Sequence, residues 1–205
     1  VGRDYKQNQI KITASKHLTL RNILEVSSNE KGIELIGIVD SHAPNILYEI
    51  KQLIHVGEAY ELSGGGIRYR NVTLLLGSEI ELYDEYSQGP FHVLIFLPTV
   101  EKMEHFSQWL KDKMKNIHLS SQRIYCTGIK LQRKIKELEG LFIPAHVFTP
   151  FKSLYGRGVK QSLTEVFDPD LIDAIELGLS SDTEMADHIK ELHRYTYLTN
   201  SDSHS

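Results

Sequence analysis

Short apolar runs alternate with amphipathic segments along the whole chain, and this alternation limits the folds available. The apolar runs are rich in β-branched residues, which is typical of buried strands, and the segments between them carry apolar residues at helical spacing. Alternating strands and helices predict an α/β fold built on a parallel sheet or barrel. Expected strands cover 33–39, 72–82, 91–97, 141–147, 174–177 and 195–200, and expected helices cover 44–55, 100–114, 127–138 and 181–192. A first helix starts near the N-cap residue Thr19 and stops at Lys31 and Gly32, and the glycines at 64–66 mark a turn.

Composition excludes several classes of protein. The chain has 205 residues, of which 40% are hydrophobic and 24% charged, so it is neither disordered nor fibrous. Its apolar runs are too short to span a bilayer, and the single cysteine, Cys126, excludes a disulfide framework within the chain. We expect one cytoplasmic domain covering residues 1–205. The start at Val1 and the polar end favour a piece of a longer protein.

Residue types that bind metals collect at the ends of the expected strands. Side chains two residues apart point the same way in a strand, so a pair such as Asp40 and His42 can present two ligands on one face. In parallel α/β folds, sites form at the carboxyl ends of the strands. Imidazole and carboxylate ligands suit zinc, iron or manganese, and close divalent ions promote phosphoryl displacement. The candidate ligands are Asp40, His42, Glu79, Glu81, His92, His146, Asp202 and His204.

A structural interpretation of these residues stays open. A single histidine on an apolar strand, such as His92, is more often a core residue than a ligand. Glu79 is harder to explain in this way, because a carboxylate in a run as apolar as 74–80 needs a partner.

Five short motifs together resemble a known family. They are Ile38-Val-Asp-Ser-His42, Gly77-Ser-Glu-Ile-Glu81, Phe91-His-Val-Leu-Ile95, Pro144-Ala-His146 and Asn200-Ser-Asp-Ser-His204. Their order is similar to the successive metal motifs of the PHP (polymerase and histidinol phosphatase) family. The segment 140–156 is similar to the corresponding part of the endonuclease-Q-like members, which nick DNA beside deaminated bases and abasic sites.

This resemblance implies a fold, a cofactor and roles for particular residues. The fold would be a distorted (β/α)7 barrel that holds two to three divalent ions, namely Zn, Mn, Fe or Mg. Glu79 would bridge two ions, His92 and His146 would complete one of them, and Asp202 would ligate the other. His42 and His204 would hold a third, Asp40 would be a further ligand, and Glu81 would lie behind the ligands. Glu79 and Asp202 would be the catalytic residues.

One family motif is absent from the chain. The first strand of the family carries a His-x-His pair, whereas His17 has no second histidine two residues away. Either the pair and its strand lie before Val1, or this member has lost them. The abrupt start favours the first explanation.

The loop after His146 combines cations with aromatic side chains. We expect Lys152, Tyr155, Arg157 and Lys160 to contact DNA, although a plain surface loop is an equal alternative. The segment 111–136 carries eight basic residues and one acidic residue, and it could follow a phosphate backbone or form a solvated helix face. The acidic segment 165–191 is expected to be solvated surface.

These observations predict a metal-dependent phosphodiesterase, an endonuclease acting on deaminated-base or abasic DNA. Two alternatives stay open. One is a small-molecule phosphatase of the histidinol-phosphate type, and the other is a non-catalytic nucleic-acid-binding domain with a vestigial metal site.

Overall fold

The computed structural model describes residues 1–30, 32–179 and 181–204. These residues form two compact units. Unit 1 comprises Val1–Ser78, Phe96–Gln122 and residues 203 and 204, and unit 2 comprises Glu79–Ile95 and Arg123–Asp202. The single domain expected from the sequence stays a prediction.

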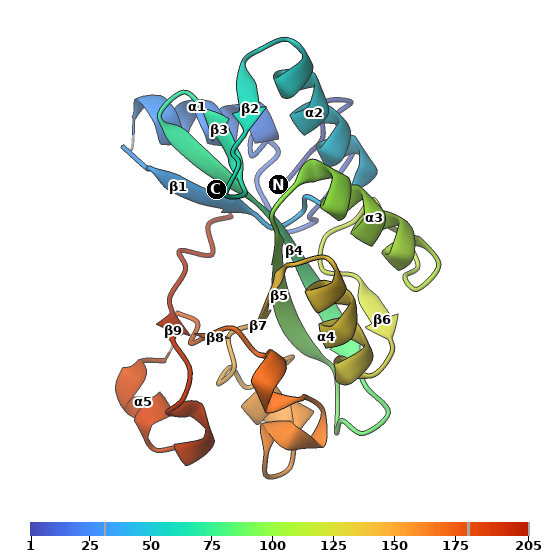
Figure 1. The fold of residues 1–205 in the computed structure, drawn as a ribbon, viewed down its shortest axis with the longest axis vertical. Coiled ribbons are helices and arrows are strands. Elements are labelled where there is room, and N and C mark those ends of the chain that lie inside the picture. Colours follow the sequence, from blue (N-terminus) through green and yellow to red (C-terminus); the bar gives the residue numbers. More distant parts are fainter. Residues whose placement is uncertain (31, 180, 205) are drawn as a thin grey trace. The chain divides into compact units, whose positions relative to one another are not determined.

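Unit 1 combines a mixed sheet with three helices (Figure 1). Strand β1 (Leu35–Ile38) runs parallel to the first part of β4 (Val72–Tyr83). Strands β2 (Ala59–Glu61) and β3 (Ile67–Tyr69) form an antiparallel hairpin, and β3 is antiparallel to β4. The helices are α1 (Leu20–Asn29), α2 (Pro44–His55) and α3 (Val100–Lys111).

Local sequence signals explain where these helices begin. The hydroxyl of Thr19 accepts a hydrogen bond from the backbone N–H of Asn22, and Thr99 caps α3 in the same way. Pro44 opens α2, where a missing N–H costs nothing. The apolar face predicted for α2 is buried in the core through Ile46, Leu47, Ile50 and Leu53.

Unit 2 contains the last part of β4 and most of β5 (Phe91–Leu97), with β5 hydrogen-bonded to β7 (Leu141–Pro144). Strand β6 (Arg123–Tyr125) runs parallel to β4, and β8 (Ile175–Glu176) runs parallel to β9 (Tyr197–Leu198). The helices are α4 (Gly128–Glu137) and α5 (Thr183–Asp187). Short helical turns lie between them at Leu154–Gly158, Leu163–Glu165 and Pro169–Leu171, and another follows α5 at Lys190–Leu192.

Three phenylalanines form the centre of the core in unit 2. The ring of Phe167 meets Phe91 edge-on at 5.4 Å and Phe142 at 5.1 Å between centroids. Gly128 leaves room for this cluster, because a Cβ there would lie 2.4 Å from the carbonyl oxygen of Val166. The packing fixes the start of α4 and the strands that carry the candidate ligands.

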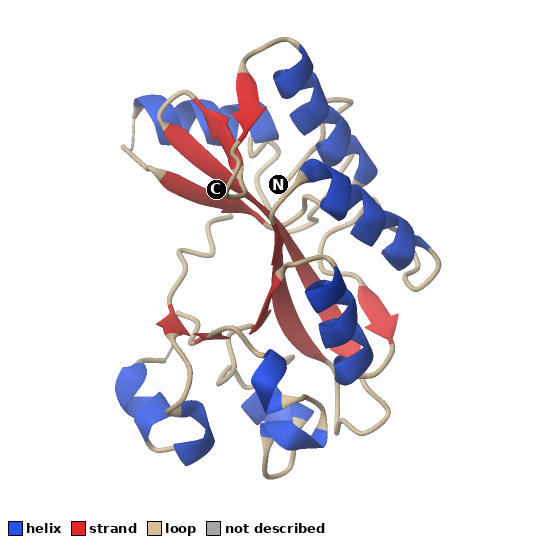
Figure 2. Ribbon diagram, in the orientation of Figure 1, coloured by secondary structure: helices blue, strands red, loops and turns tan. Residues whose placement is uncertain are grey.

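The α/β class is confirmed, whereas the all-parallel sheet is wrong (Figure 2). The glycine-rich turn at 63–66 reverses the chain, so that Gly65 and Gly66, both with positive φ, place β2 and β3 antiparallel. These two strands and β6 were not predicted, because three-residue strands carry little periodic signal. The (β/α)7 barrel stays a prediction.

The helices differ from expectation mainly at their ends. The helix expected over 181–192 is the short α5 followed by a separate turn. Helix α1 ends at Asn29, and the stop expected at Lys31 lies outside the described residues. No helix among the residues that the structure describes has the length and apolar character needed to cross a bilayer.

Candidate metal centre

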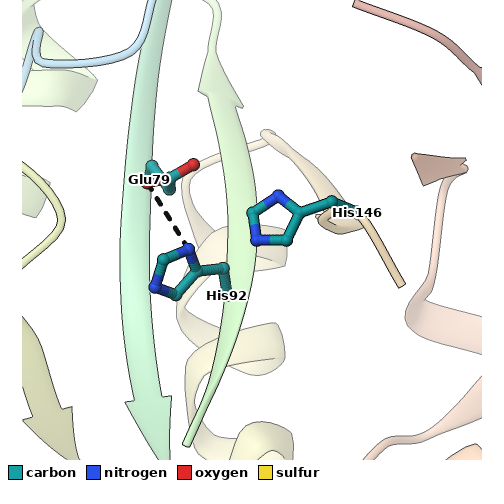
Figure 3. Close-up of side chains that lie close together, drawn as sticks. All are labelled: Glu79, His92 and His146. Atoms are coloured by element: carbon teal, nitrogen blue, oxygen red, sulfur yellow. Dashed lines mark ion pairs between the residues drawn. The ribbon is translucent and has the colours of Figure 1, made fainter. Parts of the chain in front are cut away.

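Three side chains of metal-binding type converge in unit 2 (Figure 3). Glu79 comes from β4, His92 from β5 and His146 from the segment after β7. One ligand atom of each residue lies within 4.8 Å of the other two. The imidazole rings of the two histidines meet edge-on, with centroids 5.0 Å apart. One carboxylate and two imidazoles form a donor set that suits a divalent transition metal.

His92 lies between two carboxylates. Its Nδ1 is 3.6 Å from Oε1 of Glu79, and its Nε2 is 3.6 Å from Oε1 of Glu81. Both ring nitrogens are buried and make no hydrogen bond among the described residues. A buried polar atom without a partner is costly, so the donor atoms of this ring fit a bound cation.

His146 is fixed by its backbone and by Glu176. Its φ of 32° places it in the left-handed region, and its N–H donates to Oε2 of Glu176 at 2.9 Å. Asn200 in turn donates to Oε1 of Glu176 at 2.7 Å. Gly178, with φ 82°, faces the histidine at a point where a Cβ would lie 2.9 Å from the Cβ of His146. These contacts hold the imidazole in position.

The charge of His146 is set by opposing effects. Burial lowers the pKa of this imidazole, but three carboxylates outweigh burial and raise the pKa above its ordinary value; they are Glu176, Glu79 and Asp202. Three carboxylates therefore act on this imidazole, and carboxylates near a histidine are the surroundings that a divalent cation favours.

Glu81 connects the histidines to two cations. Its Oε1 lies 2.7 Å from Nζ of Lys152, and its Oε2 accepts a hydrogen bond from Nε of Arg123. His92 first, and then these two cations, lower the pKa of Glu81 to about 2 although burial opposes them. Glu81 is therefore ionised at neutral pH and holds two basic side chains beside the cluster.

A second pair of candidate ligands lies in unit 1. Asp40 and His42 follow β1 and are buried. Nδ1 of His42 lies 2.7 Å from the hydroxyl of Ser78, and burial lowers the pKa of the imidazole. Oδ2 of Asp40 lies 2.5 Å from the amino group of Val1. His204 belongs to unit 1, where its carbonyl oxygen accepts a hydrogen bond from the N–H of Ser15.

The structure therefore brings together Glu79, His92 and His146 as the sequence predicted. Asp202 belongs to the same unit and contributes to the pKa of His146. The ligand roles assigned to these three residues and to Asp40, His42, Asp202 and His204 stay predictions.

Sequence analysis missed Glu176 and Arg123. The acidic segment 165–191 was expected to be solvated, which is wrong for Glu176, because this residue is only 8% exposed. The available signal was the argument already applied to Glu79: a carboxylate within a short apolar strand needs a partner. Arg123 lacked a comparable signal, since β6 is too short to predict.

The residues expected to contact DNA differ in how exposed they are and in which partners they have. The side chain of Lys152 is 55% exposed while it pairs with Glu81, and Arg157 stacks over the ring of Phe151 at 5.0 Å. Lys160 is also exposed. Tyr155 differs, because its hydroxyl donates to Oε1 of Glu191 at 2.6 Å and its ring stacks on Phe148.

Known proteins similar to this chain include a longer relative of high identity. The Bacillus subtilis protein YqxK is 60% identical over 205 residues, which cover the whole chain and 53% of YqxK. No protein-family model matches the chain.

Two solved endonuclease structures share both sequence and fold with the chain. Endonuclease Q in complex with a 27-mer duplex with an abasic lesion at the active site is 32% identical, with a TM-score of 0.79 over 95% of this chain and 46% of its own. The lesion-specific endonuclease PfuEndoQ from Pyrococcus furiosus is 30% identical, with a TM-score of 0.80 over 100% of this chain and 48% of its own. The chain thus spans about half the length of these relatives.

A more distant structure extends the likeness in fold. A protein from Bifidobacterium adolescentis described as a metal-dependent phosphoesterase is 13% identical, with a TM-score of 0.57. The resemblance to endonuclease Q, predicted from the segment 140–156, is therefore confirmed, and the more distant structure shares the fold.

Proposed function

We propose that this chain is a metal-dependent phosphodiesterase that cuts DNA at deaminated bases or abasic sites. The cluster of Glu79, His92 and His146 carries the proposal, because three donor atoms lie within 4.8 Å of one another and the imidazole nitrogens of His92 have no hydrogen-bond partner among the described residues. The similarity to endonuclease Q, whose solved complex contains an abasic duplex, supports DNA as the substrate.

Glu79, His92 and His146 would hold a divalent ion, with Asp202 as a further ligand in the same unit. Asp40, His42 and His204 are proposed to bind a further ion in unit 1. When bound, such ions activate water and withdraw negative charge from a phosphate. The candidates for the metal are Zn, Mn, Fe and Mg; imidazole donors favour Zn and Fe, whereas Mn and Mg would rely mainly on the carboxylates.

The protein side chains would contribute orientation and charge. Glu176 accepts a hydrogen bond from the backbone N–H of His146, and its Oε2 lies 3.7 Å from Nδ1 of the ring, so it would help to orient the imidazole. Glu79 and Asp202 are the proposed catalytic carboxylates, which would orient the attacking water and hold its proton on a carboxylate oxygen. The ammonium group of Lys152, held by Glu81, would neutralise charge that develops on the phosphate.

Nicking assays test this proposal directly. Duplexes containing uracil, hypoxanthine or an abasic site are compared with an intact duplex in the presence of Mn²⁺ or Zn²⁺. We expect nicking of the damaged duplexes only, its loss in EDTA, and a fall of about 1,000-fold or more in Glu79→Ala.

A matched control is His105→Ala, which removes an exposed histidine from α3 and should nick normally. Retained nicking in Glu79→Ala would contradict the role of that carboxylate. Hydrolysis of small phosphomonoesters without nicking would instead identify a small-molecule phosphatase, and substoichiometric metal without any hydrolysis would indicate a vestigial site.

A further inference from the structure

Two exposed tyrosines stand side by side where β4 and β6 end in unit 2. Tyr83 of β4 pairs in register with Tyr125 of β6, and their ring centroids are 5.7 Å apart at an angle of 45°. Tyr83 is 36% exposed and Tyr125 is 70% exposed. Large rings on strands are usually covered by the core or by a neighbour, so this pair offers an aromatic surface to a ligand.

Arg123 fixes a positive charge beside the pair. It lies opposite Glu81 in the same register, and its guanidinium carbon is 5.5 Å from the centroid of the Tyr83 ring. Hydrogen bonds to Tyr125 and to the carboxylate of Glu81 raise the pKa of Arg123. The cation is therefore held by contacts on three sides and is oriented before any ligand arrives.

The aromatic pair shares a strand face with the metal cluster. Glu79, Glu81 and Tyr83 alternate along β4, so their side chains project from the same face. Four residues of strand place Tyr83 ~13 Å from Glu79 along the chain. This is a short distance on the scale of a nucleic-acid backbone, so one strand could reach both places.

Two cations lie beside Glu81 on this strand face and could meet a phosphate. Arg123 and Lys152 both pair with Glu81, and Glu79 on the same face carries a further negative charge that the proposed divalent ion would offset. The carboxylate of Asp84 is turned away from solvent, because its Oδ2 accepts a hydrogen bond from the N–H of Gly128. Glu85 is the remaining acidic residue next to Tyr83 in the chain, and it is exposed.

We propose that Tyr83 and Tyr125 form a stacking site for one unpaired nucleobase of a DNA strand, with Arg123 contacting the adjacent phosphate. Stacking of a base on an aromatic side chain contributes about 1–3 kcal/mol and tolerates any base. The phosphate contact positions the strand without reading its sequence. This inference rests on the proposed function, and it adds a binding site outside the metal cluster and outside the loop that follows His146.

Binding in EDTA tests the stacking site without requiring catalysis. The fluorescence anisotropy of a labelled single-stranded oligonucleotide and of an abasic duplex is titrated with the chain. We expect Tyr125→Ala to weaken binding by about 5- to 100-fold, and Tyr125→Phe and Tyr125→Trp to stay within about twofold of the parent chain. The control Tyr60→Ala removes a tyrosine of β2 in unit 1 that is also largely exposed, at 59%, and should bind normally.

The outcomes separate this inference from the nuclease proposal. Binding that depends on Tyr125, without nicking under any metal, supports the stacking site and contradicts the nuclease. Nicking and binding that are both unchanged in Tyr125→Ala overturn the stacking site and leave the nuclease standing. If Tyr125→Phe weakens binding as much as Tyr125→Ala, the hydroxyl rather than the ring is responsible, and the inference is also overturned.

Discussion

Both units contain a cluster of histidine and carboxylate side chains, but the two clusters differ in accessibility. In unit 1, Asp40 is 1% exposed and His42 is 0% exposed. In unit 2, the side chains of His92 and His146 are 12% and 22% exposed. Residue type is therefore shared, whereas access to solvent is not.

The two clusters also differ in how their histidines are hydrogen-bonded. In unit 1, Ser78 holds a ring nitrogen of His42, and the hydroxyl of Ser107 donates to the carbonyl oxygen of His42 at 2.6 Å. In unit 2, His92 has no hydrogen bond from its ring among the described residues. Nε2 of His42 is nevertheless buried without a hydrogen bond to the described residues, as both ring nitrogens of His92 are. Removing His42 should therefore cost stability in addition to its proposed metal binding, whereas removing His92 should mainly cost metal binding.

The largest expected effect on stability comes from replacing His42 by alanine, and His92→Ala is its comparison. We expect His42→Ala to lower the free energy of unfolding by about 3 kcal/mol, because it leaves a cavity and strands the hydroxyl of Ser78. His92→Ala should lower it by less than His42→Ala does, because its side chain is 12% exposed and the loss is confined to packing and to the ion pairs with Glu79 and Glu81. Urea denaturation in the presence of a chelator measures the free energy of unfolding of both variants. A larger loss of stability in His92→Ala than in His42→Ala would contradict this prediction.

Two carboxylates predict opposite dependence of stability on pH. Burial raises the pKa of Glu49 in unit 1 to about 7, and its Oε2 is buried without a hydrogen bond. The folded state then binds more protons than the unfolded state between pH 4.5 and 7, so stability falls as pH rises through this window. Glu81 in unit 2 behaves oppositely, since its lowered pKa makes its contribution disappear as pH falls from 4.5 towards 2.

We expect Glu49 to cost about 2 kcal/mol at pH 7 after allowance for its partial exposure. Glu49→Gln should therefore be more stable than the parent chain at pH 7 and nearly equal to it at pH 4.5. Chemical denaturation across this range measures the difference. Parallel pH profiles for the two chains would show that Glu49 does not titrate in this window.

A smaller effect tests the hydrogen bond within the unit 1 cluster. Ser78→Ala removes the partner of His42 Nδ1 and should destabilise the fold by about 1–2 kcal/mol. In the double variant with His42→Ala, the two losses should not add, because both remove the same contact. Additive losses in a double-mutant cycle would mean that the two residues act independently.

The smallest expected effect on stability belongs to a cation beside the unit 2 cluster. Lys152→Ala should change the free energy of unfolding by less than about 0.5 kcal/mol, because the lysine side chain is half exposed and Glu81 keeps its pair with Arg123. It should nevertheless weaken DNA binding and reduce the salt slope by about one. Lys51, whose side chain is about as exposed and pairs with Glu104 in unit 1, is the matched control. If Lys152→Ala and Lys51→Ala weakened DNA binding equally, Lys152 would have no special role in binding DNA.

The sequence predicts the centre of the site better than its surroundings. Glu79 was identified because a carboxylate interrupts an apolar strand, and His92 and His146 because they lie at strand ends, which are local signals. The hairpin of β2 and β3 and the contribution of Arg123 depend on pairing between distant short segments. The solvent exposure of His42 depends on the side chains that pack around it in the folded chain. No pattern of neighbouring residues in the sequence specifies that packing.

Titration with Zn²⁺ or Mn²⁺ tests most directly whether Glu79, His92 and His146 bind a divalent ion. Isothermal calorimetry on the parent chain should show metal binding that weakens by more than about 100-fold in His92→Ala and in His146→Ala, since loss of a direct ligand exceeds loss of an outer partner. His105→Ala, an exposed histidine on α3, should bind as the parent does. Metal affinity that is unchanged in both His92→Ala and His146→Ala would contradict the account.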